Sequence, residues 1–546
     1  MESFSSFLSR EWKAVAVFGG FFTAASVAVI LSVDPAYFYP RMQTDPVRYL
    51  LKAHALMETG TTEASRAINL QPFRYAAAPG VMRIPILLAF KDFDDQLRAI
   101  QLTNVIFVLA VALMSAFVLS WTQPQKRHWM TIAFSLAFCA LAPWWTANIL
   151  YPLADAPYAA FSLGALIVSV RIVTSDRPVA EQWRMLLLFA ALFVGAFLIR
   201  FSAPVILVFT AALAYGRWKG SRLSLRAVLL GIAVPVAVVT LLVFLNRDVI
   251  FKRYLIDQMW FIREADDVLL ALNPFASAIP SQIVPGFYLI YSRPPVIGAM
   301  DMAFGTTRTD AFWVIVGLCI SAIVFVGMWR ARHRFLPEIL YVIAPFPVLA
   351  VIAPSAGRYF ASYQPFFWIL FLSGASYLVA PWARRFGRRQ MTIGVLGAGA
   401  CIVAVTGLRL TRVVGTANPK SAVSVMRARE YVHGVATPFR DLRNFLDTIP
   451  RGRALLLGSP TSRGRWTVIS GFKYYVPDRR LSAVAQTRDI FLVSECGTME
   501  VCRDFGAWTQ VLKDEIRANG NFRIDSIFAR ATASAHVAVF RVTPAP

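Results

Sequence analysis

The sequence predicts a polytopic α-helical membrane protein with about eleven transmembrane helices, helices lying beside the membrane, and a C-terminal α/β domain. Of its 546 residues, 57% are hydrophobic and only 16% are charged, which does not fit the composition of a soluble domain. The hydrophobic residues are gathered into stretches of about 20 residues, the length that crosses a bilayer. Strand-like segments occur together only from about residue 411 onward, which predicts a separate domain there.

The apolar stretches divide the first part of the chain into membrane spans. The first stretch, 14–33, is too long for the core of a signal peptide and is not followed by a small-residue cleavage site, so we interpret it as a retained span. We therefore expect a transmembrane domain over 1–410 and a soluble α/β domain over 411–546. The other apolar stretches are 100–121, 130–146, 156–173, 185–202, 203–216, 226–245, 311–328, 336–354, 365–381 and 391–408.

The net charge of +24 is concentrated in short loops between alternate spans. Basic loops mark the cytoplasmic side of a membrane protein. The N-terminus is therefore expected in the cytoplasm, and an odd number of spans places the C-terminal domain on the periplasmic or extracellular side. Topology explains this charge, so we predict membrane lipids and no nucleic acid as partners. The loops are QKRH (125–128), 171–184, RWKGSRLSLR (217–226), RARHR (330–334) and RRFGRR (384–389).

Between the first two spans, the segment 34–99 is long and amphipathic. Its stretch TDPVRYLLKAHALMETG (44–60) has apolar residues at spacings of three to four, which predicts an amphipathic helix. The stretch RYAAAPGVMRIPILLAF (74–90) is apolar but too interrupted by prolines to cross a bilayer. Both are expected to lie in the membrane interface, with Arg74 and Arg83 available to headgroups or phosphates.

The tail contains four strand-like segments and an amphipathic helix, DFGAWTQVLKDEIRAN, at 504–519. Strands that alternate with helices predict a small α/β domain. In an oxidising outer compartment, Cys496 and Cys502 would be a plausible disulfide, and two separate thiols are the alternative. The strand-like segments are RALLLG (453–458), DIFLV (489–493), FRIDSIF (522–528) and HVAVFRV (536–542).

Two aspartates stand at the beginning of predicted helices on the same side of the membrane. Asp45 precedes a proline directly, and Asp155 lies in ILYPLADAPYAAF (149–161), two residues before another. Each can cap a helix, or it can act on a substrate. Because basic residues lie between them in the sequence, we consider the hypothesis that these residues form a binding site for a charged, lipid-linked substrate. Asp34, which also precedes a proline, provides an internal control for the capping interpretation.

A third motif, SAGRYFASYQPFFWILF (355–371), carries Arg358 and Tyr359 at the outer mouth of two late spans. The two residues can simply anchor the chain at the membrane interface, as arginine and tyrosine often do. Alternatively, the guanidinium group can grip a phosphate, for which its planar fork of donors is well suited.

Together these motifs resemble those of the GT-C glycosyltransferases, membrane enzymes that use polyprenyl-phosphate sugars and include the aminoarabinose transferases and protein O-mannosyltransferases. DPVRYLLKAHALMETG resembles their D-x-x-x-Y-x-x-x-A-x-x-L opening. LADAPYAAF is similar to their second acidic motif, and RYFASYQP to their late R-Y-(x)n-P motif. The resemblance implies transfer of a sugar from a polyprenyl-phosphate donor to a lipid, glycan or protein hydroxyl at the outer face of the inner (plasma) membrane.

The resemblance also implies roles for individual residues. Asp45 would act as the base that accepts the proton of the acceptor hydroxyl. Asp155 would be the second catalytic carboxylate. No cofactor is evidently required. The histidines and cysteines are scattered and do not have the spacing of a metal site. Some relatives use a divalent cation, so the need for one is left open. The residues expected to bind the donor are Tyr49, Arg74, Arg83, Arg358 and Tyr359.

Two other classes of function compete with a glycosyltransferase. A transporter or flippase of lipid-linked sugars would favour ionisable residues in mid-span and paired, discontinuous helices. A non-enzymatic envelope assembly protein would not need acids and phosphate-binding bases on one surface. The sequence names neither the sugar nor the acceptor.

Overall fold

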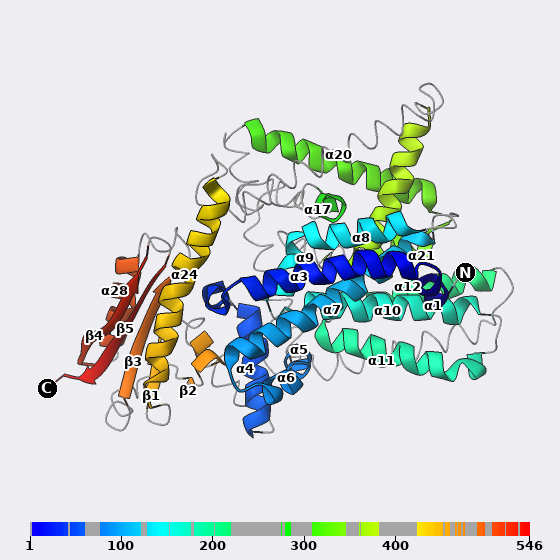
Figure 1. Ribbon diagram of the computed structural model, residues 1–546. Helices are drawn as coiled ribbons and strands as arrows, with labels where there is room; N and C mark the ends of the chain where they lie inside the picture. Colours follow the sequence, from blue (N-terminus) through cyan, green and yellow to red (C-terminus); the bar gives the residue numbers. More distant parts are fainter. Residues whose placement is uncertain are drawn as a thin grey trace. The chain divides into compact units, whose positions relative to one another are not determined.

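A computed structural model of the 546-residue chain provides the fold (Figure 1). Its contacts divide the chain into two compact units, each described by itself here. Unit 1 comprises 1–24, 106–148 and 154–413, and unit 2 comprises 25–105, 149–153 and 414–546. The described residues are 3–41, 44–59, 77–121, 128–151, 153–175, 179–200, 203–219, 275, 279–284, 308–332, 334–344, 360, 362–381, 423–450, 454–458, 465–466, 468–470, 473–474, 489–496, 505–518, 520–532 and 535–545.

Unit 1 is helical throughout its described part. Two long helices, α3 (Gly20–Ser32) and α7 (Phe93–Ser120), contribute residues to both units. The other helices are α1 (Phe4–Arg10), α2 (Trp12–Ala14), η1 (Val15–Gly19), α8 (Trp129–Leu141), α9 (Pro143–Leu150), α10 (Asp155–Thr174), η4 (Val179–Gln182), α11 (Trp183–Ile199), α12 (Val205–Lys219), α17 (Ile279–Ile283), α20 (Arg308–Ala331), α21 (Leu336–Ile343) and the helix 364–381.

Three helices in the described residues are long and apolar enough to cross a membrane. They cover Trp12–Ser32, Phe93–Ser120 and Asp155–Thr174. Shorter apolar helices, among them Trp183–Ile199 and Ile315–Ala331, coincide with other predicted spans. The protein is therefore mostly helical with candidate membrane spans, as predicted, and the number of about eleven spans stays a prediction.

One pair of helices in unit 1 packs through glycine. A Cβ atom added to Gly327 of α20 would overlap the carbonyl oxygen of Leu370, and one added to Gly374 would overlap the carbonyl oxygen of Ile323. Only glycine allows two helix backbones to approach this closely. The two helices therefore cross at this point with their main chains in contact.

Unit 2 combines a short helical segment with the C-terminal sheet. The helical segment contains η2 (Pro35–Arg41), α4 (Thr44–Thr59), α5 (Ala77–Val81) and α6 (Ile84–Ala89). The C-terminal part contains α24 (Val423–Asp447), β1 (Ala454–Leu457), β2 (Lys473–Tyr474), β3 (Asp489–Cys496), α28 (Phe505–Ala518), β4 (Phe522–Ala531) and β5 (His536–Pro544).

The sheet confirms the predicted strands and the predicted helix of the tail. Its strand order is β2-β1-β3-β5-β4, with β1 parallel to β2 and β3, and β5 antiparallel to β3 and β4. Side chains alternate between its faces. Leu456, Phe491 and Val539 pack with α24, whereas Leu457, Leu492 and Phe540 pack with α28. The sheet is thus the middle layer between two helices.

The core under α24 extends beyond the C-terminal domain that the sequence predicts. Buried side chains of η2, α4 and the beginning of α7 belong to the same cluster as those of α24 and the sheet, including Tyr39, Leu50 and Leu97. The division at residue 410 stays a prediction. The contacts place the segment between the first two spans in one compact unit with the tail, which the sequence did not indicate.

Candidate functional site

The helix α4 carries the first motif. It begins at Thr44, so Asp45 and Pro46 lie in its first turn, where a proline is compatible with the helix because its missing N–H needs no partner. Pro46, Val47 and Leu50 are buried, and Tyr49 is half-buried. The side chain of Asp45 lies outside the described part of the structure. Its role as cap or as base therefore stays a prediction.

The helix α5 crosses α4 at close range. A Cβ atom on Gly80 would lie 2.6 Å from the carbonyl oxygen of Tyr49, closer than real side chains allow. Glycine at this position lets α5 and the turn that follows it pack directly on the turn of α4 that carries Tyr49. The close approach ties the position of Arg83, three residues later, to that of α4.

Arg83 lies in the turn between α5 and α6 and is 2% exposed. Its Nη2 donates to Asn104 Oδ1 at 2.7 Å and, more weakly, to the carbonyl oxygen of Leu153 at 3.5 Å. Its buried Nη1 has no hydrogen-bond partner, and no carboxylate of the described residues forms an ion pair with it. Burial lowers the pKa of the Arg83 guanidinium to about 10.

Polar side chains of α7 hold the loop that faces Arg83. Asn104 Nδ2 donates to the carbonyl oxygen of Tyr151 at 2.9 Å, and Gln101 Nε2 donates to that of Leu150 at 2.9 Å. Because the two residues are three positions apart, they lie on one face of the helix. The side-chain amide of Asn104 and the carbonyl group of Leu153 therefore hold Arg83 through its Nη2. Its Nη1 can still donate a hydrogen bond to another acceptor. Chemically, such a group is suited to an anion.

Asp155, in unit 1, has a different environment. It lies at the beginning of α10, is 4% exposed, and forms an ion pair with Arg200, which follows the end of α11. Asn148 donates to its other oxygen at 3.5 Å and accepts the N–H of Ala156 at 2.9 Å. The guanidinium of Arg200 also lies 5.6 Å from the ring centre of Tyr158. The carboxylate thus joins the ends of two helices, and a buried ion pair of this kind has a structural use by itself.

The remaining predicted site residues are only partly described. Cys496, at the end of β3, is disulfide-bonded. Its predicted partner Cys502 lies outside the described residues, so the pairing stays a prediction. The binding residues Arg74, Arg358 and Tyr359 also lie outside them. The described residues contain no group of three or more histidine, cysteine or acidic side chains that could hold a metal ion. The use of a divalent cation, which the sequence left open, stays untested.

Sequence reasoning missed the residues that hold Arg83 and Asp155. Asn104 and Gln101 lie within the apolar stretch 100–121, and polar residues inside a span are a signal of function or of specific contacts. Arg200 is a charge at the end of an apolar stretch, which on the sequence alone is indistinguishable from an interfacial anchor.

Comparison with known proteins provides a further finding about the fold. No protein-family model matches the sequence, and no curated protein matches it significantly. The crystal structure of ArnT from Cupriavidus metallidurans bound to undecaprenyl phosphate is similar, with a TM-score of 0.51, 15% identity, and coverage of 96% of this chain and 98% of ArnT. The apo state of ArnT gives the same TM-score and identity.

An archaeal oligosaccharyltransferase, AglB from Archaeoglobus fulgidus, in complex with an inhibitory peptide and a dolichol-phosphate, shows a weaker likeness. Its TM-score is 0.42 at 12% identity, with coverage of 95% of this chain and 74% of AglB. The likeness to ArnT, a GT-C protein, extends along nearly the whole of both chains. The chain therefore has the fold that the motif resemblance predicted.

Proposed function

We propose that this chain is an integral-membrane glycosyltransferase that moves a sugar from a polyprenyl-phosphate donor to an acceptor hydroxyl. The observation that carries the proposal is Arg83, a buried guanidinium whose Nη1 has no partner, in a chain that shares its fold with ArnT. Burying a guanidinium is unfavourable when no carboxylate pairs with it, as is the case for Arg83 among the described residues. A phosphate oxygen at Nη1 would supply the missing acceptor and the missing negative charge.

In the proposed reaction, the oxygen of the acceptor hydroxyl attacks the anomeric carbon of the donor sugar. The bond from that carbon to the phosphate oxygen breaks, and its electron pair leaves with the polyprenyl phosphate. The hydroxyl proton passes to Asp45, which contributes roughly 10²–10⁴-fold to such a reaction as a general base. Arg83 stabilises the charge that develops on the departing phosphate.

The other predicted residues take supporting roles in this proposal. Tyr49 lies one turn after Asp45 on α4, and Arg74, Arg358 and Tyr359 would add donors for the phosphate. We assign Asp155 to the arrangement of α10 and α11 because Arg200 already neutralises it. The N-terminus would lie in the cytoplasm and the C-terminal domain on the periplasmic or extracellular side, as the basic loops predict.

The phosphate interaction can be tested on the purified full-length protein in detergent. Thermal unfolding is followed as undecaprenyl phosphate is titrated, with undecaprenol as the ligand that lacks the phosphate. A charge-assisted hydrogen bond contributes about 1.5–3 kcal/mol, so Arg83→Met should weaken binding by about 10–100-fold. Arg83→Lys should retain part of the affinity because its charge remains. Arg530→Met, at an exposed arginine paired with Asp441, is the matched control.

The stability of the empty variant distinguishes a ligand-binding arginine from a structural one. Arg83→Met loses a hydrogen bond to Asn104 but also removes a desolvated charge that has no ion-pair partner in the described part of the chain. The unliganded variant should therefore be as stable as the wild type or more stable. A variant that is strongly destabilised and still binds undecaprenyl phosphate like the wild type would contradict the proposal.

The transfer reaction itself is tested in cells. A strain that lacks the protein should accumulate a polyprenyl-phosphate sugar and lose a sugar from a surface lipid, glycan or protein, both measured by mass spectrometry. A flippase would instead leave its lipid-linked sugar on the cytoplasmic side, and a non-enzymatic assembly protein would accumulate no lipid-linked donor.

A further inference from the structure

Two aspartates mark the ends of the segment that carries α4 and Arg83. Asp34 follows α3, and its Oδ1 accepts the N–H of Ala36 at 3.0 Å in η2. Asp92 precedes α7, and its Oδ2 accepts the N–H of Asp94 at 2.8 Å. Both are therefore capping residues, one beside the first candidate span and the other beside the second. Everything between them belongs to unit 2.

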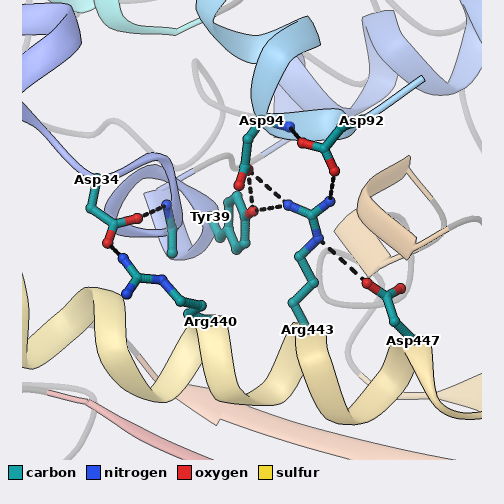
Figure 2. A network of polar contacts seen from close by, with 8 residues as sticks. Asp34, Tyr39, Asp92, Asp94, Arg440, Arg443 and Asp447 are labelled. Carbon is teal, nitrogen blue, oxygen red and sulfur yellow. Dashed lines mark hydrogen bonds and ion pairs between the residues drawn. The ribbon is translucent and has the colours of Figure 1, made fainter. Parts of the chain in front are cut away.

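The helix α24 of the tail contacts both of these caps. Figure 2 shows two of its arginines, one turn apart, each directed at one capping carboxylate. Arg440 forms an ion pair with Asp34 Oδ2. Arg443 Nη2 donates to Asp92 Oδ1 at 2.6 Å. One helix thus binds two residues that are far apart in the sequence and that lie at the two ends of the segment 34–92.

Arg443 makes the more extensive set of contacts. Its Nη1 donates to Tyr39 Oη at 2.7 Å and lies 2.9 Å from Asp94 Oδ1, and Tyr39 in turn donates to the same carboxylate. Its Nε lies 3.7 Å from Asp447 on its own helix. The side chain of Arg443 is 13% exposed. Three acceptors at 2.6–2.9 Å and a fourth oxygen at 3.7 Å fix the position of this guanidinium better than a single exposed ion pair would.

A second contact holds η2 shortly before α4 begins. Arg465 Nη2 donates to the carbonyl oxygen of Pro40 at 3.1 Å, and Tyr39 meets the ring of Trp466 edge-on at 6.2 Å between centres. Pro40 lies four residues before the beginning of α4 at Thr44. The tail therefore also holds the end of η2, four residues before α4 begins.

We infer that the C-terminal domain positions the donor site, and that Arg443 is the positioning residue that couples α24 to the segment bearing Asp45, Tyr49 and Arg83. The inference rests on the proposed function of that segment. Arg443 touches no reacting atom in this arrangement. It acts by holding Tyr39 and the cap of α7, so that α4 and the turn of Arg83 have one position before the lipid binds. Binding groups held in place before the ligand arrives give higher affinity.

The test separates positioning from general stability by means of two variants of the full-length protein. Arg443→Met removes all contacts of the guanidinium with the segment, and Arg443→Lys keeps the charge. Leu512→Ala is the matched control, because Leu512 is buried between α28 and the opposite face of the sheet. That variant should destabilise the same unit without touching the segment 34–92.

Two measurements are made well below the unfolding temperature of each variant. Hydrogen exchange of the α4 and α6 amides, without lipid, reports how firmly the segment is held. The dissociation constant for undecaprenyl phosphate reports the donor site. For Arg443→Met we expect faster exchange in α4 and an affinity lower by on the order of 10-fold. Arg443→Lys should restore most of the affinity, and Leu512→Ala should change neither quantity.

The outcomes distinguish this inference from the proposed function. If Arg443→Met leaves the exchange of α4 and the affinity at wild-type values, the positioning role is refuted even though lipid binding stands. If Leu512→Ala lowers the affinity as much as Arg443→Met does, the effect is one of general stability and the inference is again refuted. If wild-type protein binds no undecaprenyl phosphate, the proposed function fails, and the exchange measurement still decides whether Arg443 holds α4.

Discussion

The buried ion pair between Arg465 and Glu495 should be among the strongest single determinants of stability in the tail. Arg465 Nη1 contacts Glu495 Oε1, and Trp466 Nε1 donates to Glu495 Oε2 at 2.8 Å. The side chains of the two charged residues are only 7% and 6% exposed. Glu495→Gln preserves the shape and one acceptor but removes the negative charge, and so leaves the guanidinium buried without a counter-charge.

The size of the effect follows from this geometry. Removing one partner of a buried ion pair typically costs about 3–5 kcal/mol. We expect the lower end, about 3 kcal/mol, because the glutamine oxygen and the carbonyl group of Pro40 still accept from Arg465. Asp514→Asn is the control, since Asp514 and Arg517 form a pair in which both side chains are more than half exposed, worth about 0–1 kcal/mol.

The assay is thermal unfolding of the full-length protein in detergent, followed by tryptophan fluorescence. At roughly 2–4 °C per kcal/mol for a unit of 150–250 residues, the midpoint of the Glu495→Gln variant should fall by on the order of 6–12 °C. The double variant Arg465→Met/Glu495→Gln should be less destabilised than the two single losses together, because no unpaired charge remains. A midpoint of Glu495→Gln within about 1–2 °C of the wild type, a range usual for surface changes, would show that the buried ion pair contributes little to stability.

Three further predictions concern the acidic residues of the two units. Asp45→Asn keeps the size of the side chain in the first turn of α4 but removes the base, so sugar transfer should fall by about 10²-fold or more at unchanged thermal stability; normal transfer would exclude Asp45 from the mechanism. Arg200→Met leaves Asp155 buried without its cation and should cost about 3–5 kcal/mol in thermal unfolding, whereas an unchanged midpoint would show that the pair is dispensable. Burial raises the pKa of Asp92, but its backbone and guanidinium contacts outweigh this and hold the pKa below 3.8. Ionised Asp92 therefore stabilises the folded protein fully above the ordinary aspartate pKa, and this stabilisation is lost as the pH falls through the lowered pKa. The stability of Asp92→Asn should accordingly depend less on pH below about pH 4 in an acid-unfolding experiment.

The structure also corrects the choice of control for Asp45. By its sequence, Asp34 is another aspartate before a proline and would cap a helix without further consequence. Its ion pair with Arg440 of α24 makes Asp34→Asn a perturbation of the contact between the tail and the segment 34–92. Asp514→Asn, at an exposed position of α28, is the neutral substitution.

Local patterns in the sequence determined much of this protein. Apolar stretches of span length predicted the mostly helical architecture because backbone groups in a bilayer must be satisfied within a helix. Short, mostly apolar segments predicted the strands of the tail, and the amphipathic pattern of longer segments predicted α4 and α28. The order of three short motifs predicted the shared fold with ArnT. Each of these patterns involves only residues that are close together in the sequence, so it can be recognised without the tertiary structure.

Only the tertiary structure decided which charges are paired and which are not. The sequence predicted a phosphate-binding role for Arg83 but did not distinguish Arg200 or Arg443 from other basic residues. In the structure, Arg83 has an unpartnered nitrogen, Arg200 neutralises Asp155, and Arg443 binds the cap of α7. Arg443 meets Asp92 across 351 positions of the chain. No periodicity or composition encodes such a contact, because the electrostatic environment of a buried charge depends on which distant groups packing brings within a few ångströms of it.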